Sequence, residues 1–468
     1  MIKKNMQAGE LKLRKNAVLA IGMIVGLGIA VFACVLAYSG TFKRKPDIIL
    51  ITCDALRADH LGCYGYKRMT SPVIDRLASD GALFLNCFST SCSTLHAIPA
   101  LISGRYLAVS ELDVFNGESC NIIDGKFTLL AEYLRKSGYQ TAAFVCNDFV
   151  RQGTGFEHGF DVFKMCVGSS GTVTDKIIDF LNRYNRAKPY FIWVHYCDTH
   201  VPYFSPAEFS AVFKNDRFYN ENNAVLAVDL VPRGTYPKDG SISRKAFHKG
   251  EFSSNYYTAL YDAAIRHNDS QIGRLLTHVD DNTVIIVTAD HGESLGEHNK
   301  YFHHISMYDE VLRIPLIIRD NGYFKGGKKI PVLVSSVDIV PTILNRINPF
   351  WYFFVKNRFD GIDLARAAGS PPNRKYIYSY FPGIRCIRDV KKNIKYMIFP
   401  DDKEALYRIP DEENNLINDD SLRDEKQELK RSLRAWLKEY PVNVDGNRRK
   451  CALDEQAQEN LRSMGYIQ

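Results

Sequence analysis

The sequence predicts an α/β fold in which helices flank a largely parallel β-sheet. Five short apolar runs have the length and composition of strands buried on both faces, as in a parallel sheet; they are Ile48–Cys53, Ala142–Cys146, Tyr190–Val194, Val284–Thr288 and Pro315–Ile318. Amphipathic patterns over Thr128–Ser137 and Tyr257–His278 predict helices between them. Strands that alternate with helices are typical of α/β proteins.

The length of 468 residues suits one large domain or two. We expect the main domain over 47–345 and a smaller C-terminal α+β subdomain over 346–468, where the strand and helix patterns loosen. In the latter, Ile394–Phe399 predicts a strand and Leu422–Glu439 an exposed, highly charged helix. Phe204–Ser254 is polar, contains Gly and Pro, and is expected to be a long surface excursion.

The N-terminal region predicts a membrane anchor. Residues 17–38 carry no charge and are long enough to cross a bilayer, and a basic segment precedes them. We therefore expect a cytosolic tail over 1–16, a transmembrane helix over 17–38, a linker over 39–46, and a single-pass membrane protein whose main domain is extracytoplasmic. The alternatives are a cleaved signal peptide and a lipid anchor at Cys34.

Composition excludes some partners and constrains the cysteines. The net charge is only +7, and no basic patch with interleaved aromatic residues is present, so we expect no nucleic-acid partner. Eleven cysteines are scattered without paired metal-binding spacing. This pattern argues against a disulfide framework, although one or two bridges remain possible.

Three of the predicted strands end in side chains that can bind a metal or move a proton. These are Asp54 after the first strand, His195, Asp198 and His200 after Tyr190–Val194, and Asp290 and His291 after Val284–Thr288. One such aspartate could simply cap a helix, but three strands that end alike favour a site, because ligands bind at the carboxyl ends of parallel strands. Asp54, Asp290 and His291 offer two carboxylates and one imidazole, a mixture that suits Zn or Mn better than Ca or Mg.

Two further stretches contain reactive side chains. In SCSTLHAIPALISGRY, Ser91–Tyr106, the residues Cys92, Ser93, Thr94 and His96 are all candidate nucleophiles or ligands. In FHHISMYDE, His303 is a candidate acid that protonates a leaving group, or a second metal ligand. The alternative is that one of His303 and His304 is a surface residue and the other is packed.

Several of these motifs together resemble the sulfatase family of the alkaline phosphatase superfamily. PDIILITCDALRADHLGCYGY, FIWVHYCDTHVPY and DNTVIIVTADHGESLGEH are similar to motifs of that family and occur in the same order, within a likeness that runs from Pro46 to Leu416. The resemblance implies an alkaline phosphatase-like fold. It also implies that Asp54, Asp290 and His291 bind metal beside the nucleophile. His200 and His303 would contact the ester or its leaving group.

The resemblance also suggests substrate-binding positions. Arg57, His195 and Asp198 lie within the matching motifs and are expected near the substrate. An arginine at position 57 could equally brace its own loop.

The sequence departs from sulfatases at the nucleophile. Their motif begins with Cys or Ser, which is converted to formylglycine, and ends eleven residues later in Gly-Arg; counting back from Arg105 gives Thr94, whereas Cys92 is out of register. Ala55 also replaces the family's second early aspartate. Threonine cannot become formylglycine, but it can act as a metal-activated alkoxide.

A threonine nucleophile resembles one branch of the superfamily, the phosphoethanolamine and phosphoglycerol transferases and nucleotide pyrophosphatase-like phosphodiesterases. Their metal set resembles Asp54, Thr94, Asp290 and His291. We also expect a helix that begins near Ala97, with Pro99 in its first turn and its amides facing an anionic ester. Ser93 is the rival nucleophile.

These observations predict a metal-dependent hydrolase or transferase that acts on phosphate esters or diesters through Thr94. One alternative is a sulfuric ester hydrolase acting on sulfated sugars or aryl sulfates; another is a non-catalytic binding module on the same fold. The expected partners are an ester-bearing lipid, sugar or small molecule and, through the N-terminal helix, a membrane.

Overall fold

The computed structural model describes residues 21–23, 25–26, 28–29, 44–106, 119–121, 127–214, 225–229, 241–243, 247–248, 250–302, 306–324, 326–370, 374–440 and 450–452. The chain divides into two compact units, Met1–Lys45 and Pro46–Gln468. The second unit contains every element discussed below. The expected boundary at 345/346 lies within it and stays a prediction.

The predicted membrane segment over 17–38 lies mostly outside the described residues. Residues 21–23, 25–26 and 28–29 are helical. Within the described part of the chain, no helix has the length and apolar character needed to cross a membrane. The tail over 1–16, the transmembrane helix and the linker over 39–46 therefore stay predictions.

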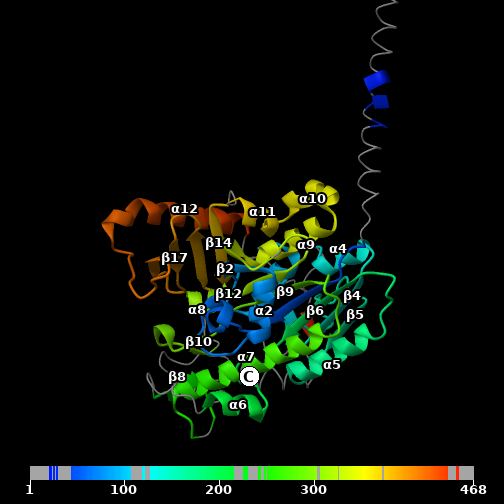
Figure 1. Ribbon diagram of the computed structural model, residues 1–468. Coiled ribbons are helices and arrows are strands. Elements are labelled where there is room, and N and C mark those ends of the chain that lie inside the picture. Colours follow the sequence, from blue (N-terminus) through cyan, green and yellow to red (C-terminus); the bar gives the residue numbers. More distant parts are fainter. Residues whose placement is uncertain are drawn as a thin grey trace, which may run out of the picture. The chain divides into compact units, whose positions relative to one another are not determined.

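A nine-stranded mixed sheet forms the centre of the second unit (Figure 1). Its strands are β1 (Ile48–Cys53), β2 (Ala82–Phe88), β4 (Gln140–Val145), β5 (Val162–Met165), β6 (Tyr190–Tyr196), β9 (Val284–Ala289), β12 (Arg313–Ile314), β13 (Leu316–Arg319) and β14 (Lys328–Ser335). The neighbours run in the order β12-β2-β13-β9-β1-β6-β4-β5, and β14 pairs with β2. The predicted α/β fold is confirmed.

The sheet is less uniformly parallel than expected. Strands β5, β4, β6, β1 and β9 are parallel neighbours, which is why β1, β6 and β9 are fully buried apolar runs. The predicted strand at Pro315–Ile318 is β13, but it runs antiparallel to both β9 and β2.

Helices cover both faces of the sheet, with α5 and α7 on one side and α4 and α9 on the other (Figure 1). The main helices are α2 (Pro72–Asp80), α3 (Thr94–Ser103), α4 (Leu130–Lys136), α5 (Ser170–Leu181), α7 (Ser254–Leu276) and α9 (Ile339–Ile347). The long helix α7 begins after Ser253, whose hydroxyl accepts a hydrogen bond from the Tyr256 amide at 3.3 Å. Its apolar positions Leu260, Ile265 and Ile272 are buried in the main core.

Shorter elements surround this framework. The short helices are α6 (Ala207–Lys214), α8 (Asp309–Leu312), α10 (Pro349–Val355) and α11 (Leu364–Gly369). Three two-stranded sheets are formed by β3 (Ser119–Asn121) with β19 (Lys450–Ala452), by β7 (Ala227–Asp229) with β8 (Ser241–Ser243), and by β10 (Ser294–Leu295) with β11 (Tyr301–Phe302). Helix α6 lies in the polar excursion and packs on α7, where Phe213 contacts Ala259 and Ala263. The excursion is therefore partly anchored.

The C-terminal region carries a second, antiparallel sheet. Its strands, in spatial order, are β15 (Tyr376–Phe381), β16 (Ile384–Asp389), β17 (Ile394–Ile398) and β18 (Glu404–Arg408). The predicted strand at Ile394–Phe399 is β17. Helix α12 (Arg423–Glu439) is charged, but its prediction as an exposed helix is wrong for one face, because Leu429, Leu433 and Trp436 are buried against this sheet.

Helix α3 differs from the expectation in a way that matters for the site. It begins at Thr94 rather than near Ala97, and Ser93 is its N-cap residue with extended backbone angles. Pro99 therefore lies inside the helix and not in its first turn. Gly104, in the left-handed conformation with φ of 72°, ends the helix. This start places Thr94 at the first helical position.

Candidate active site

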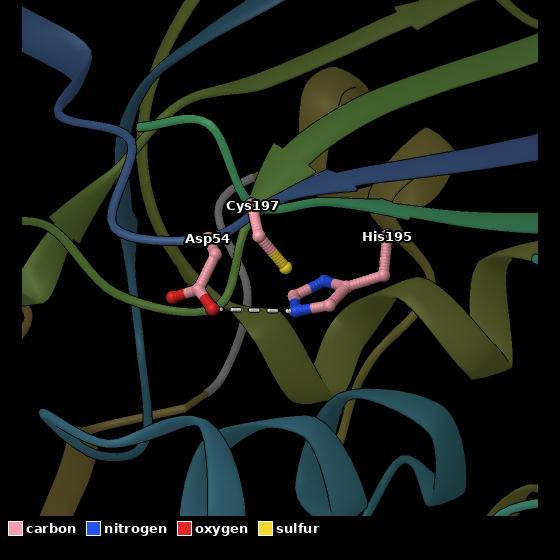
Figure 2. A group of neighbouring side chains, drawn as sticks. All are labelled: Asp54, His195 and Cys197. Carbon is pink, nitrogen blue, oxygen red and sulfur yellow. Dashed lines mark ion pairs between the residues drawn. The ribbon is translucent and has the colours of Figure 1, made fainter. Parts of the chain in front are cut away.

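The carboxyl ends of four neighbouring strands bring the predicted site residues together. In the register of the sheet, Cys53 pairs with Ala289 and Thr52 pairs with His195, so that Asp54 lies between the ends of β6 and β9. Figure 2 shows His195, on β6, with its imidazole directed at Asp54; Nε2 lies 3.6 Å from Asp54 Oδ2. These strand ends lie together, as predicted, because β6, β1 and β9 are parallel neighbours in the sheet.

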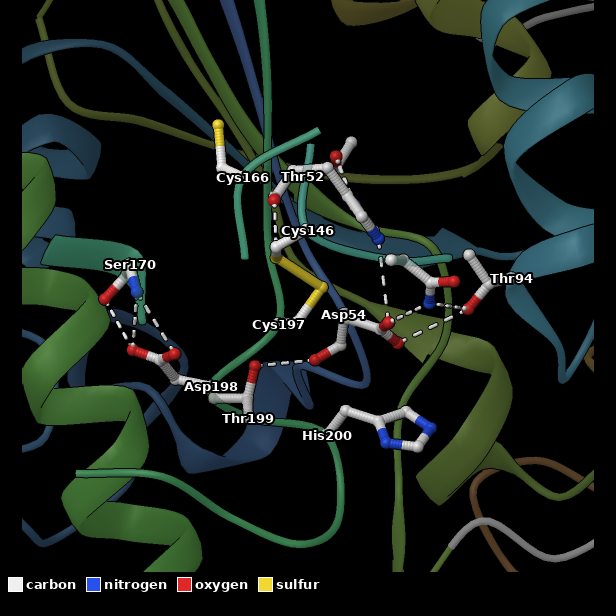
Figure 3. Close-up of a disulfide and its surroundings, with 12 residues drawn as sticks. Thr52, Asp54, Thr94, Cys146, Cys166, Ser170, Cys197, Asp198, Thr199 and His200 are labelled. Carbon is white, nitrogen blue, oxygen red and sulfur yellow. Dashed lines mark hydrogen bonds and ion pairs between the residues drawn. A yellow bond between two sulfur atoms is a disulfide. The ribbon is translucent and has the colours of Figure 1, made fainter. Parts of the chain in front are cut away.

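Thr94 joins this group from the start of α3 (Figure 3). Its Oγ1 lies 3.4 Å from Asp54 Oδ1 and 3.4 Å from His291 Nε2. His291 Nε2 is 3.5 Å from Asp54 Oδ1 and 3.5 Å from Asp290 Oδ2. We call Asp54, Thr94, Asp290 and His291 the Asp54 cluster; all four side chains are essentially inaccessible to solvent.

Backbone groups orient the ligand atoms of this cluster. His291 Nδ1 donates to the Gly292 carbonyl at 2.8 Å, so Nε2 carries the lone pair and faces the carboxylates. Asp290 Oδ1 accepts from the amides of His291 at 2.9 Å and Ala55 at 3.2 Å. These hydrogen bonds orient the two side chains through His291 Nδ1 and Asp290 Oδ1, so that His291 Nε2 and Asp290 Oδ2 face each other.

The residues of the Asp54 cluster fit a divalent metal. Asp290 Oδ2 is buried and has no hydrogen-bond partner among the described residues. In the described part of the chain, the ion pairs of Asp54 and Asp290 are with imidazoles and not with lysine or arginine. Asp54, Asp290 and His291 each offer a ligand atom within 4.8 Å of the others. Two buried carboxylates with so little compensating charge are the environment that a cation stabilises.

Charge interactions shape the titration of the site. Burial alone would raise the pKa of Asp54, but the facing imidazoles, of which His200 has the largest influence, hold that pKa well below its usual range. Burial lowers the pKa of His200. Burial, together with the charge of Asp54, raises the pKa of Glu293 well above its ordinary value. The site therefore favours a charged Asp54, a neutral His200 and a protonated Glu293.

His200 lies beside the cluster, as the resemblance implied (Figure 3). Its Nδ1 donates to the Val201 carbonyl at 2.6 Å, which leaves Nε2 as the ring atom that can accept a proton. Thr199, one residue earlier, donates from its hydroxyl to the Asp54 carbonyl oxygen at 2.6 Å. The loop after β6 is thus tied to the loop after β1.

Two predicted substrate-binding residues are paired with side chains outside the Asp54 cluster. Asp198 accepts from the Ser170 amide and hydroxyl at the start of α5 and pairs with His267 on α7 at 2.8 Å. Arg57 pairs with Asp59 at 2.8 Å and with Glu297 at 2.7 Å. Both side chains tie loops to neighbouring elements, which for Arg57 is the bracing alternative considered above.

Two other candidates are not part of the described cluster. His303 lies outside the described residues, as does His304. Cys92 packs in an apolar cluster with Phe88 and Met307, and burial raises the pKa of its thiol to about 12. Its side chain is therefore an inert core residue in this structure.

Asn147 is a site residue that the sequence reasoning missed. It follows β4 by two residues, and its Nδ2 donates to Asp54 Oδ2 at 2.7 Å and to Thr94 Oγ1 at 3.4 Å. The sequence contains a signal for it, because Asn147 directly follows the predicted strand Ala142–Cys146. A residue that follows a parallel strand lies at the same edge of the sheet as Asp54 and Asp290. It was overlooked because asparagine is neither a titratable group nor a common metal ligand.

Comparison with known sequences identifies the family. A sequence model of the family described as Sulfatase matches residues 46–348. The chain therefore belongs to the sulfatase family, as its motifs suggested. It is 26% identical to iduronate 2-sulfatase of Mus musculus over 365 residues, covering 63% of this chain and 62% of that protein. It is 23% identical to N-acetylglucosamine-6-O-sulfatase of Bacteroides thetaiotaomicron over 382 residues, covering 64% and 68%.

Solved structures support the same fold. BT4656 in complex with its substrate D-glucosamine-2-N,6-O-disulfate superimposes with a TM-score of 0.64 at 21% identity, covering 85% of this chain and 98% of that one. The phosphonate monoester hydrolase of Agrobacterium radiobacter superimposes with a TM-score of 0.65 at 20% identity, covering 87% and 100%. BT4656 and the phosphonate monoester hydrolase thus share this architecture.

Proposed function

We propose that this member of the sulfatase family is a metal-dependent ester hydrolase or transferase that uses Thr94 as its nucleophile and acts on phosphate esters or diesters. The observation that carries the proposal is the position of Thr94. Its hydroxyl is the group that faces Asp54 and His291 from the first position of a helix, while Cys92 packs into the core. A threonine cannot be converted to formylglycine.

The helix start favours an anionic substrate. The Thr94 and Leu95 amides precede the first hydrogen bonds at the start of α3, which His96 and Ala97 donate to the Ser93 carbonyl. Together with the partial positive charge at the helix N-terminus, they would stabilise a phosphoryl group beside Thr94. Asn147 Nδ2 adds a neutral donor between Asp54 and Thr94. These groups would stabilise the negative charge that develops on the ester oxygens in the transition state.

The proposed reaction has two displacement steps. The proton of Thr94 Oγ1 moves to His200 Nε2 as the oxygen forms a bond to phosphorus and the bond to the leaving alcohol breaks; His200 or His303 then protonates the departing alcohol. Water, or a second alcohol, then displaces Thr94, which regains a proton, and the product leaves. Since His200 Nε2 carries a lone pair and burial lowers the pKa of His200, this residue is suited to accept the proton of the incoming water.

Asp54, Thr94, Asp290 and His291 would hold the metal. A divalent ion there would supply a Lewis acid that favours the Thr94 alkoxide at neutral pH. The mixed oxygen and nitrogen ligands favour Zn or Mn over Ca or Mg. The proposal keeps the N-terminal membrane anchor and an extracytoplasmic location for the rest of the chain, on the evidence of the uncharged segment 17–38.

A second candidate is the hydrolysis of sulfuric esters of sugars, and the comparisons favour it over phosphate esters. The relatives are named as sulfatases, two of them after sulfated sugar positions, and BT4656 is described with a disulfated glucosamine. The matched region covers only about three fifths of iduronate 2-sulfatase, so its activity is not transferred whole. The phosphonate hydrolase shows that the same fold also serves phosphorus chemistry.

One experiment separates the two candidates. The purified full-length chain, supplied with Zn or Mn, would be assayed on nitrophenyl sulfate, nitrophenyl phosphate and bis-nitrophenyl phosphate. Intact mass and peptide mapping after exposure to the best substrate would then locate any adduct. We expect turnover of a phosphate ester and a phosphoryl adduct on Thr94. Turnover of the sulfate alone, or formylglycine at Cys92, would overturn the proposal.

A further inference from the structure

The two oxygens of Asp54 face two different sets of side chains. Oδ1 points into the Asp54 cluster, 3.4 Å from Thr94 Oγ1 and 3.5 Å from His291 Nε2. Oδ2 points to the other side, where it accepts from Asn147 Nδ2 at 2.7 Å and lies 3.6 Å from His195 Nε2. The mechanism above uses the first set and Asn147, but it gives His195 no role.

His195 presents an unused nitrogen to this second side. Thr52 Oγ1 donates its single proton to the Val194 carbonyl at 3.0 Å and accepts from Trp193 Nε1 at 3.1 Å. The same hydroxyl lies 2.8 Å from His195 Nδ1, and while it donates to Val194, His195 Nδ1 is the donor of that contact, in the tautomer that leaves the lone pair on Nε2. This atom is fully buried and has no hydrogen-bond partner among the described residues.

Such an arrangement is typical of a metal-binding histidine. A ligating imidazole commonly donates its other N–H to a fixed partner, which sets the tautomer and the direction of the ring. Here Thr52 provides that partner. The separation of 3.6 Å between His195 Nε2 and Asp54 Oδ2 is longer than a hydrogen bond, so the two lone-pair atoms face each other across a gap.

Cys197 supplies a third potential ligand atom at this gap (Figure 2). Ligand atoms of Asp54, His195 and Cys197 all lie within 4.8 Å of one another. In the structure, Cys197 is joined to Cys146 in a disulfide, with a Cα–Cα distance of 6.1 Å (Figure 3). The bridge links the ends of β4 and β6 and occupies the sulfur that would complete the ligand set.

We propose that reduction of the Cys146–Cys197 disulfide creates a second metal site, in which Asp54 Oδ2, His195 Nε2 and the Cys197 thiolate bind one divalent ion. A dithiol reductant supplies two electrons and two protons, the S–S bond breaks, two thiols form, and the reductant becomes a disulfide. On binding, the Cys197 thiol releases its proton to solvent, and the metal keeps its charge of two plus.

The donor set indicates which metal it would take. One sulfur, one imidazole nitrogen and one carboxylate oxygen suit Zn, and three protein ligands leave a fourth position open. Asp54 would then contribute one oxygen to each of two sites. The second site shares Asp54 with the site of Thr94. The oxidation state of Cys146 and Cys197 would therefore control whether a second metal ion binds next to the nucleophile.

The test uses Co(II) as a spectroscopic probe, since a thiolate bound to cobalt gives a near-ultraviolet charge-transfer band. The full chain is titrated with Co(II) before and after reduction by a phosphine, which does not compete for the metal as a dithiol would. We expect no band in the oxidised protein, and after reduction a band with one additional metal equivalent per chain. No gain in either would overturn the proposal.

Three variants identify the sulfur. Cys146→Ser leaves Cys197 without its disulfide partner and should give the band without any reductant, whereas Cys197→Ser should give none under either condition. Cys166→Ser is the matched control, because Cys166 is a buried free cysteine in the same region, and it should behave as the wild type. A band in reduced Cys197→Ser would assign the thiolate to another cysteine and refute the site.

One further variant tests the role of His195. Thr52→Val removes the acceptor of the His195 Nδ1 proton and should weaken Co(II) binding to the reduced protein by roughly 10-fold or more. Unchanged affinity would contradict the assignment of His195. The titration measures metal equivalents and the thiolate band, and it does not measure turnover. The second metal site can therefore be confirmed if the proposed function of Thr94 is wrong, and it can be refuted if that function is right.

Discussion

In the described part of the chain, the Asp54 cluster and a second buried cluster of charged side chains differ in how their charges are compensated. In the Asp54 cluster, two carboxylates are accompanied by imidazoles and a hydroxyl. In the C-terminal region, the fully buried Lys395 lies 3.0 Å from Asp309 and 2.6 Å from Glu412, and Arg388 also pairs with Asp309. We call the latter four residues the Lys395 cluster. Its cations match its anions.

The difference separates a site that requires a ligand from one that holds the fold. A buried carboxylate without a cationic partner is costly, so the Asp54 cluster persists most favourably when a metal neutralises it. The Lys395 cluster is complete without any ligand and joins β16 and β17 to α8 and to the loop after β18. The balance of charge therefore indicates which cluster binds a ligand and which one stabilises the fold.

The largest effect is expected for Thr94→Ala. Loss of the nucleophile should reduce kcat/KM on the best ester by at least about 1,000-fold, while the metal content falls little, since Asp54, Asp290 and His291 remain. Steady-state kinetics and metal analysis on the same samples provide the measurement. Thr94→Ser, which keeps a hydroxyl, is the matched control. Full turnover in Thr94→Ala would mean that another group, such as Ser93, attacks the ester.

The next largest effect is on stability, at the Lys395 cluster. Lys395→Met leaves Glu412 and part of Asp309 buried without a cation, which should lower the free energy of unfolding by about 3–5 kcal/mol. Turnover per folded molecule should not change, because the cluster lies outside the site. Urea unfolding measures the first quantity. The control is Lys403→Met, whose partner Asp401 is exposed and which should leave stability unchanged.

A smaller effect is expected for Asn147→Ala. The variant loses the amide that holds Asp54 Oδ2, and we expect kcat/KM to fall roughly 10- to 100-fold because the metal ligand is less well oriented. Asn147→Asp would place a negative charge beside Asp54 and should lose more activity. If Asn147→Ala behaved as the wild type, the 2.7 Å contact with Asp54 would have no part in catalysis.

The smallest effect concerns pH and the Lys395 cluster. Burial opposes ionisation of Asp309, but Arg388 and Lys395 outweigh it and lower the pKa of this carboxyl to about 2. Because the pKa is depressed in the folded state, the stabilisation is present above the ordinary aspartate pKa and is lost as pH falls through about 2, a loss of about 2 kcal/mol.

Urea unfolding between pH 6 and pH 2 measures this loss. Asp309→Asn should be less stable than the wild type at pH 6 and should approach it as the pH decreases. Parallel curves for the two proteins across the whole range would show that Asp309 does not titrate in the manner described.

The sequence predicted much of the fold and of the site because those features are local. The apolar runs before Asp54, His195 and Asp290 predict buried parallel strands, and the order of motifs identifies the family without any coordinates. The register of Thr94 against Arg105 selected Thr94 over Cys92, and the structure places Thr94 rather than Cys92 beside Asp54 and His291. Local pattern and spacing were sufficient for these inferences.

Side-chain direction was decided only in three dimensions. Arg57 and Asp198 occupy motif positions, yet they pair with Glu297, Ser170 and His267, which belong to other segments of the chain and lie outside the Asp54 cluster. Sequence proximity to a strand end does not determine which of its neighbours a side chain meets. The start of α3 at Thr94, rather than near Ala97, likewise depended on the packing of the whole helix, which is buried along its length.

The sequence by itself identified the family and predicted the strand ends and Thr94 as the candidate nucleophile, because each inference depends on residues that are close together in the chain. Only the tertiary structure brought Asn147 to Asp54 and Cys146 to Cys197, since the neighbours β4, β6, β1 and β9 are not in chain order in the sheet. Strand order places residues from distant segments at one edge, and at that edge the two oxygens of a single aspartate face two different sets of side chains.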